Sequence, residues 1–147
     1  QQLIDAIEKK NLNNIEQARN ALLNYATQGI AALDTLQAFE GDRNLSTACK
    51  FALMEYKSIA EKDVPKLTDF LLKESNFEKM KKVMEAKGDS RTKEDVSAYN
   101  KGVEDLNKAI NVYNQTNEKS NNSRKEAANR WNEGEKSFLD AHMPYYN

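Results

Sequence analysis

The feature that most constrains this chain is a stretch near its C-terminus, residues 96–141, with apolar side chains at alternating steps of three and four. Such spacing places side chains on one face of an α-helix, and that face is stable when other helices cover it. The stretch predicts an all-α fold, an antiparallel up-and-down helical bundle with a long C-terminal helix over residues 93–141. The positions of this face are Val96, Tyr99, Val103, Leu106, Ile110, Tyr113, Asn117, Ser120, Arg124, Ala127, Trp131, Gly134, Phe138 and Ala141.

The middle of this stretch, residues 114–126, is polar throughout. Three interpretations follow: the helix projects beyond the bundle, it breaks into a loop, or it buries polar side chains. One continuous helix is favoured over a loop because the three-four register resumes at Ala127. Thr92 and Asp95 match a capping box, which would open this helix, and Pro144 would end it.

Two earlier segments have the same periodicity, and each is bounded by residues that begin or end helices. Residues 14–38 are expected to form one helix, with Gly41 in the left-handed position after its end. Residues 44–73 are expected to form another, with a kink or a break at Glu61–Pro65 because proline removes a backbone hydrogen bond. In the case of a break, Asp63 would cap a new helix.

Two shorter helical segments are expected, one at the start of the chain and one before the long helix. Residues 1–10 carry a short apolar stripe and are interpreted as the tail of a first helix, the alternative being that they open the next one. Asn13 or Asn14 would cap the helix that follows. Residues 77–84 would add a turn or two before Gly88. The chain is thus expected to be one domain that lacks most of a first helix, and the uncovered apolar face would favour self-association.

The composition argues against several classes of protein. A net charge of -1 with interspersed signs is not typical of a phosphate-binding surface, so nucleic acid is not an expected partner. No apolar run approaches the roughly 18 residues that span a bilayer, so no transmembrane segment is expected in this sequence. The single cysteine, Cys49, cannot form an internal disulfide and is interpreted as a partly buried structural thiol.

Few residues of the sequence are suited to catalysis or metal binding. His142 is the only histidine, so the chain lacks the Glu-x-x-His pairs of di-iron and di-manganese bundles. His142 is interpreted as a surface residue, since Asp140, two positions away, faces another side of the helix. Ser90 and Lys93 match the Ser-x-x-Lys of penicillin-binding enzymes but lack the companion motifs. The protein is therefore expected to be non-enzymatic, with no catalytic, metal-binding or cofactor-binding residues and no cofactor.

The remaining candidates are side chains for binding an unknown protein or a small ligand. Trp and Tyr are enriched at binding hot spots. Two aromatic residues of the last helix lie seven apart on its register, so ordinary core packing is the alternative for them. Two tyrosines follow Pro144, outside the register, and two residues of the 44–73 helix fall off its apolar face and would be exposed or face the missing helix. These candidates are Trp131, Phe138, Tyr145, Tyr146, Phe51 and Met54.

A turn with the pattern phenylalanine-x-glycine-aspartate lies between two expected helices, in residues 36–42 (LQAFEGD). Ala48, residues 56–61 with a Tyr-Lys pair (YKSIAE) and residues 67–72 follow it, and the last helix is rich in aromatic residues. In these features the sequence resembles the leptospiral LIC surface proteins, a family of spirochaetes and Bacteroidetes. The resemblance covers about half of the chain. It implies a helical bundle, usually behind an export or lipoprotein signal, with a largely unassigned role.

Two classes of function are therefore expected. The first is a non-enzymatic exported bundle, periplasmic or at the cell surface, that binds a protein, a lipid or a small ligand; its extracytoplasmic location is implied by the family resemblance. The second is a cytoplasmic helical adaptor for protein–protein interaction. Residues upstream of Gln1 would separate the two, because a signal peptide with a lipid-attachment cysteine supports the first.

Overall fold

The computed structural model describes residues 1–143, which form helices joined by short turns. The predicted all-α bundle with a long C-terminal helix is confirmed. The helices are α1 (Gln2–Glu8), α2 (Leu12–Thr35), α3 (Asn44–Ser58), α4 (Val64–Lys87) and α5 (Lys93–His142); a π-helical turn, η1 (Ile59–Asp63), joins α3 to α4, and a 3-10 turn, η2 (Gly88–Ser90), follows α4.

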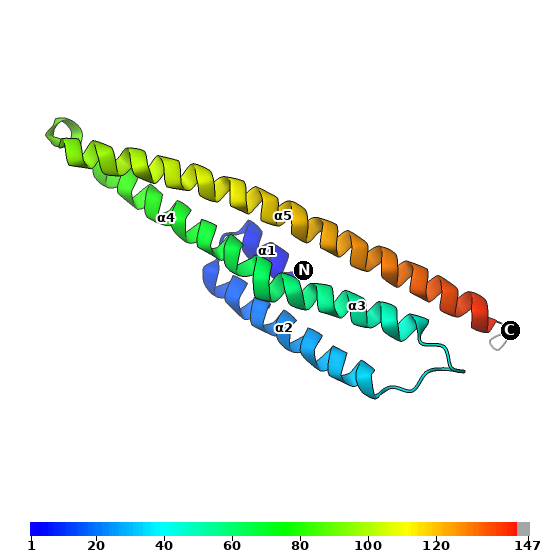
Figure 1. Cartoon of the computed structure of the whole chain (residues 1–147). Helices are drawn as coiled ribbons and strands as arrows, with labels where there is room; N and C mark the ends of the chain where they lie inside the picture. The colour runs from blue at the N-terminus through cyan, green and yellow to red at the C-terminus, as the bar shows by residue number, and fades with distance from the viewer. Residues whose placement is uncertain (144–147) are drawn as a thin grey trace.

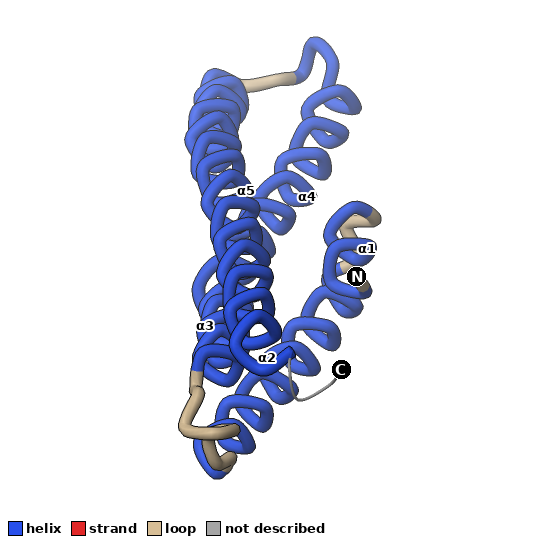
Figure 2. Tube along the Cα trace, turned by 90° about the vertical axis from the view of Figure 1, so that its right-hand side faces the viewer, coloured by secondary structure: helices blue, strands red, loops and turns tan. Residues whose placement is uncertain are grey.

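α3 and α4 follow each other end to end and run antiparallel to α5 (Figure 1). α2 packs beside α3, which lies between α2 and α5, and α1 packs against α2 near the middle of the molecule. In Figure 2, α1 and the start of α2 stand to one side of α5 and α3. As a result, the end of α4 and the start of α5 form a helical hairpin that projects beyond the other helices.

The start of the chain differs in detail from the sequence-based expectation. α1 is a helix of its own, because the chain turns at Lys10, which has a positive φ of 53°. α2 then begins at Leu12 and is capped by Asn11, whose side-chain oxygen accepts a hydrogen bond from the backbone N–H of Asn14 at 3.1 Å. The expectation that Asn13 or Asn14 would be the cap is therefore wrong by two or three positions, and residues 1–10 do not open the next helix.

The end of α2 also differs, since the helix expected over residues 14–38 ends at Thr35. Leu36 is extended, and the N–H of Asp42 donates to the carbonyl of Phe39 at 2.7 Å in a separate tight turn. Gly41 has a positive φ of 78° inside this turn, so it shapes the loop and does not end the helix.

The kink or break expected at Glu61–Pro65 is instead the π-helical turn η1. Pro65 has no N–H to donate and its ring crowds the preceding turn; a locally widened helix accommodates both effects without a break. Asp63 does not cap α4, because its side chain makes no capping hydrogen bond there. The helix expected over residues 44–73 continues through the shorter segment expected after it and ends at Lys87.

The long helix α5 has the predicted beginning and a continuous middle. The capping box of Thr92 and Asp95 is confirmed, with both reciprocal hydrogen bonds present. Residues 114–126 are helical, as favoured, and Thr116 and Ser120 are buried. Of the three interpretations of this polar stretch, the burial of polar side chains is therefore the one that the structure supports.

The apolar face predicted for α5 is confirmed at most of its positions and is wrong at four exposed ones: Val96, Ile110, Trp131 and Ala141. Val96 is 45% exposed because it belongs to the projecting hairpin, where α4 is the neighbouring helix, and Ile110 is 37% exposed on the outer side of α5. Near residue 110 the buried position is Ala109, and at the other end it is His142 in place of Ala141.

The core lies where α1, α2, η1, α4 and α5 meet. Its apolar side chains come from segments that are far apart in sequence, so it forms only when the helices are assembled. No helix within residues 1–143 combines the length and hydrophobicity needed to cross a membrane. The buried cluster consists of Ala6, Ile15, Ile59, Val64, Phe70, Leu71 and Ala109, with Leu3, Ile7, Leu12, Tyr56, Leu106 and Tyr113 packed around it.

Candidate functional site

A pocket of ≈ 540 Å³ opens between α1, α2 and α5, next to the core. Its volume falls in the range of about 300–1,000 Å³ that is usual for small-molecule sites. One wall is apolar and is formed by α1, α2, η1 and α4, whereas the wall from α5 is polar. The apolar wall contains Leu3, Ile4, Ile7, Ala18, Ala21, Leu22, Ile59, Val64 and Leu67; the polar wall contains Asn117, Ser120, Asn121 and Arg124. The pocket is also lined by Tyr25, Tyr56 and Tyr113 and, on the side of α1, by the polar residues Gln1, Gln2 and Glu8.

The polar wall exists because α5 keeps one face toward the pocket while its residue types change. Asn117, Ser120 and Arg124 follow Tyr113 in steps of four, three and four, so they continue the face that carries apolar side chains earlier in the helix. The guanidinium of Arg124, which is half-buried, donates to the side-chain oxygen of Asn121. The wall thus presents amide, hydroxyl and guanidinium groups to the pocket.

Two charged side chains line the pocket, Glu8 on α1 and Arg124 on α5. They do not form an ion pair with each other, and within residues 1–143 Arg124 has no carboxylate within ion-pair distance. Glu8 is exposed at the end of its short helix, whereas Arg124 is half-buried in the polar wall. The electrostatic interaction with a bound charge is stronger at the less solvated group.

A buried polar network lies behind the polar wall. Asp63, which is 1% exposed, accepts a hydrogen bond from the Ser120 hydroxyl at 2.8 Å and from Lys119 Nζ at 3.2 Å. Ser120 also lines the pocket, so this bond fixes the pocket face of α5 against the π-helical turn. The two donors compensate for the burial of the carboxylate.

The turn between α1 and α2 is tied to α4 by an ion pair between Lys10 and Glu74. The hydrogen bond that Lys10 donates to the Glu74 carboxylate raises the pKa of Lys10, so this lysine stays charged. The pair is partly exposed and therefore contributes little to stability. Its position nevertheless fixes the turn that follows α1, the helix whose Leu3, Ile4 and Ile7 line the pocket.

His142 is not on the surface, and the expectation that it would be is wrong. The residue is only 6% exposed. Nε2 lies 2.9 Å from the Asp42 carboxylate, and the ring packs against Phe39 and Phe138 with centroid distances of 4.9 and 4.6 Å. The physical reason is that the loop before α3 folds over the end of α5, a contact that the sequence near residue 142 does not reveal.

The side chains expected to bind a partner occupy separate environments. Phe138 packs against Phe39 at a centroid distance of 5.6 Å, so the core-packing alternative describes it. Phe51 is half-buried, and the guanidinium of Arg130 on α5 covers its ring at a distance of 4.1 Å from the centroid. Cation–π contacts of this kind stabilise helix pairs modestly.

Trp131 and Met54 are more accessible, with exposed fractions of 37% and 53%. Tyr145 and Tyr146 lie outside the described residues. No ring contact within residues 1–143 joins Trp131 to another aromatic side chain. The candidates thus do not form one cluster, and their role in binding a partner stays a prediction.

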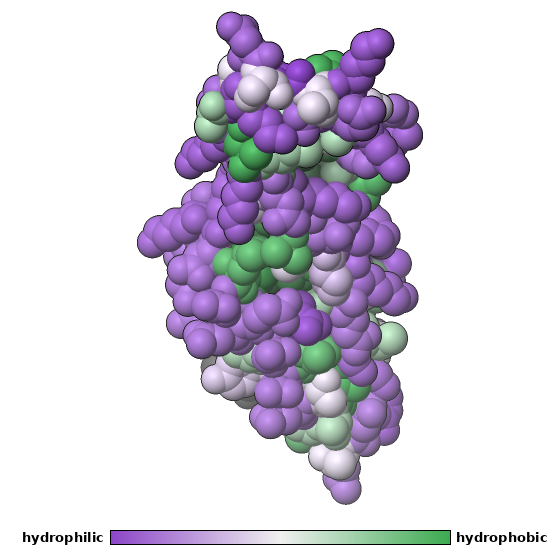
Figure 3. Space-filling model, turned by 90° about the vertical axis from the view of Figure 1, so that its left-hand side faces the viewer, coloured by the Kyte–Doolittle hydropathy of each residue, from purple (hydrophilic) through white to green (hydrophobic). Residues whose placement is uncertain are grey.

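A second pocket, of ≈ 500 Å³, lies between α4 and α5 in the hairpin, and Phe77, Met80 and Leu106 are among its lining residues. Figure 3 views the molecule from the end with the α4–α5 turn, and hydrophobic surface there lies in hollows between hydrophilic side chains. Two of the lysines that line this pocket form ion pairs: Lys73 with Asp69, and Lys108 with Glu104. In the first pocket, unlike the second, the aliphatic side chains of the lining come from elements other than α5.

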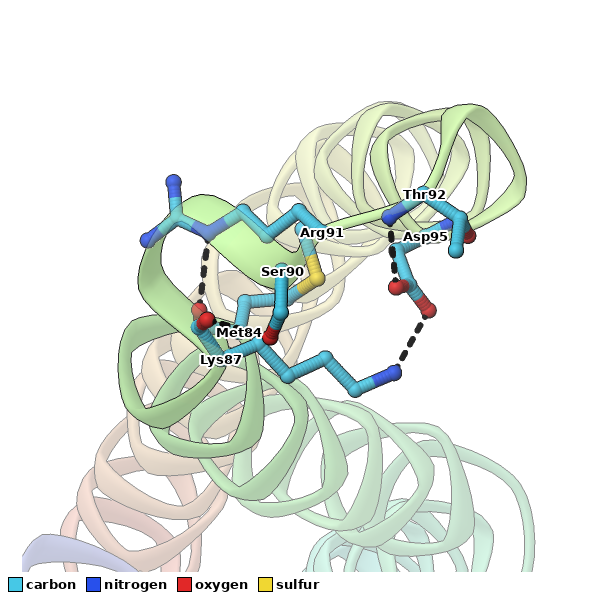
Figure 4. A network of polar contacts seen from close by, with 6 residues as sticks. All are labelled: Met84, Lys87, Ser90, Arg91, Thr92 and Asp95. Atoms are coloured by element: carbon cyan, nitrogen blue, oxygen red, sulfur yellow. Dashed lines mark hydrogen bonds and ion pairs between the residues drawn. The ribbon is translucent and has the colours of Figure 1, made fainter.

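The turn between α4 and α5 is built from local capping interactions (Figure 4). The Ser90 hydroxyl donates to the carbonyl of Lys87 at 2.6 Å, and Arg91 Nε donates to the carbonyl of Met84 at 2.8 Å. Lys87 in turn pairs with Asp95 at 2.8 Å. The Ser-x-x-Lys sequence therefore ends one helix and begins the next.

The structure provides no grouping of likely metal ligands in the part of the chain that it describes. No three His, Cys, Asp or Glu side chains within residues 1–143 are placed to hold a metal ion. Cys49 is half-buried, as the sequence predicted.

Sequence reasoning missed the pocket, although the signal was present. Asn117, Ser120 and Arg124 occupy positions on the buried register of α5, where apolar residues would be expected of a closed core. Polar side chains at such positions either bond to one another or face a cavity. Ser120 bonds to Asp63 and also lines the pocket, while the other two lie in the pocket wall.

Comparisons of this chain with protein-family models, with curated proteins and with solved structures give no match. The resemblance to the leptospiral LIC surface proteins therefore stays a prediction from residues 36–72 and the last helix.

Proposed function

We propose that this protein is a non-enzymatic binding protein that holds a small, largely apolar ligand in the pocket between α1, α2 and α5. The observation that supports this function is the pocket itself, with an apolar wall on one side and a polar wall on the other. Small-molecule sites typically combine a hydrophobic lining with a few placed polar groups. We also propose, from the family resemblance, that the protein acts outside the cytoplasm.

The proposal is supported by how the pocket walls are held. The Ser120–Asp63 hydrogen bond joins the polar wall to η1, and the Lys10–Glu74 pair joins the turn after α1 to α4. Walls fixed in this way do not have to be ordered when a ligand binds, which reduces the entropic cost of binding.

A neutral fluorescent probe tests the proposal. N-phenyl-1-naphthylamine should bind the protein saturably and at one equivalent per chain, with increased emission. Ala21→Phe should abolish this binding, because Ala21 lines the pocket and the added ring would fill it. Ala31→Phe is the matched control on the same helix, since Ala31 is exposed and does not line the pocket. Equal binding by wild type and Ala21→Phe would contradict the proposal.

A second function, a helical adaptor, is favoured by the projecting hairpin. Apolar side chains of this hairpin are exposed, among them Val83 at 56% and Val96 at 45%. Such side chains would suit a partner helix or a second copy of the chain. Photo-crosslinking from position 83 in cells, with exposed Glu135 as the control position, tests this function. An adaptor would give a defined crosslinked partner from position 83 and none from position 135.

A further inference from the structure

The polar wall of the pocket carries a cation that points to the class of ligand. Resting on the proposed function, we infer that the ligand is an anionic amphiphile, an organic carboxylate whose head group binds Arg124 and whose apolar body lies against α1, α2 and α4. The ligand is thus defined by its negative charge as well as by its hydrophobic body.

Arg124 is suited to this role by its position and by its lack of a carboxylate neighbour among the described residues. Arg124 is half-buried in the pocket wall, and its guanidinium bonds to the neutral side chain of Asn121. A guanidinium has five N–H donors in a planar arrangement that matches a carboxylate. One bond to Asn121 leaves further donors for a bound anion.

Other cations on the elements around the pocket either are paired or, like Lys9, Lys62 and Lys125, do not line the pocket. Lys10 pairs with Glu74, Arg19 with Glu16, and Lys119 with the buried Asp63. These pairs neutralise charge locally, so Arg124 is the cation of the pocket wall that an incoming carboxylate can neutralise. Ser120 and Asn117 supply further polar groups one and two turns away on the same helix.

Glu8 also lines the pocket and would favour a cationic ligand. It is exposed at the end of α1, where water screens its charge. Arg124 is half-buried on the wall that carries the other polar groups. Glu8 would attract a cationic head group and Arg124 an anionic one. The burial of Arg124 and the polar groups beside it favour the anion.

The test compares three ligands with the same ten-carbon chain at neutral pH: decanoate, decanol and decylamine. Each ligand competes with N-phenyl-1-naphthylamine for binding to the wild-type protein, to Arg124→Gln and to Lys125→Gln. Lys125 is the matched control, because it is an exposed cation next in sequence that does not line the pocket. Circular dichroism establishes that each variant is folded.

Decanoate should bind the wild-type protein most tightly of the three. Arg124→Gln should weaken decanoate about tenfold or more, as expected for a lost charge-assisted hydrogen bond. It should leave decanol within about twofold, and Lys125→Gln should change neither ligand. If Arg124→Gln unfolds, Arg124→Lys replaces it, with an intermediate loss expected because the planar donor pair is lost and the charge remains.

The outcomes distinguish the two proposals. If the probe and decanol bind but decanoate is no tighter, or if decylamine is the tightest ligand, the inference about charge is overturned and the pocket function stands. If the wild-type protein binds neither probe nor decanol, both are overturned.

Discussion

Nε2 of His142 lies 2.9 Å from Oδ2 of Asp42, a contact between two residues that are 100 positions apart. The other carboxylate oxygen of Asp42 accepts a hydrogen bond from the backbone N–H of Asn44 at 2.8 Å. One carboxylate therefore bonds both to the first residue of α3 and to the end of α5. The antiparallel pairing of α3 and α5 is fixed at this end of the molecule by that contact.

Removing either partner should destabilise the pairing of α3 with α5. Asp42→Ala and His142→Ala should each lower the thermal midpoint, and the double variant should lower it by less than the sum, because both single changes remove the same hydrogen bond. Circular dichroism melts measure the effect. Asp140→Ala is the control, since its exposed ion pair with Lys136 should matter little. Additive losses in the double variant would show that the two residues are not coupled.

Stability should fall in acid through Asp95. Lys87 and the Thr92 backbone N–H donate to this carboxylate and lower its pKa from 3.8 to about 2 (Figure 4). Because the pKa is lower in the folded state, the contribution of Asp95 is complete above 3.8 and is lost as the pH falls through 2.

Asp95→Asn should therefore have a flatter dependence of thermal midpoint on pH in this window than the wild-type protein has. Asp89→Asn, in the neighbouring 3-10 turn, is the control and should keep the wild-type slope. If Asp95→Asn also keeps that slope, the low pKa of Asp95 in the folded state is contradicted.

Asp63→Ala should lower the free energy of unfolding by about 2–3 kcal/mol, because it removes charge-assisted hydrogen bonds and leaves the buried Ser120 hydroxyl without its acceptor. Glu61→Ala, on the same turn but exposed, should cost less than about 0.5 kcal/mol. Urea unfolding measures both. A small loss for Asp63→Ala would mean that the network does not hold α5 against η1.

Two glycines of α5 should respond differently to alanine. Alanine favours a helix over glycine by about 1 kcal/mol. At Gly134 a Cβ would lie 2.5 Å from the Ala48 Cβ and 3.2 Å from the Asn44 carbonyl oxygen, and neither atom can move without its backbone. Gly134→Ala should therefore be destabilising, by about 1–3 kcal/mol.

At Gly102 the nearest atom to a Cβ would be the terminal methyl of Met80, at 2.4 Å. This flexible side chain can take another rotamer. Gly102→Ala should therefore be neutral or stabilising when both variants are unfolded by urea. A loss at position 102 as large as at position 134 would contradict this account of the packing.

Features of the fold that depend on neighbouring residues were predictable from the sequence. The capping box of Thr92 and Asp95 is encoded within four positions, and the long helix follows from spacing that repeats every three or four residues. The cap at Asn11 was missed because several asparagines compete within four positions, and the turn at Lys10 decides among them.

Features that depend on assembly were not predictable from local patterns. The burial of His142 requires Asp42 and Phe39, which lie about a hundred positions earlier. The π-helical turn before Pro65 places Asp63 in a buried contact with Ser120, 57 positions later, which the local sequence does not reveal. The pocket required the placement of α1, which no periodicity specifies.

The most direct test of the central claim is a crystal structure of the protein with decanoate. The account predicts a ligand between α1, α2 and α5, with its carboxylate within hydrogen-bonding distance of Arg124 and its chain against Leu22 and Leu67. A ligand found between α4 and α5 instead, or a pocket that stays empty at saturating decanoate, would contradict it.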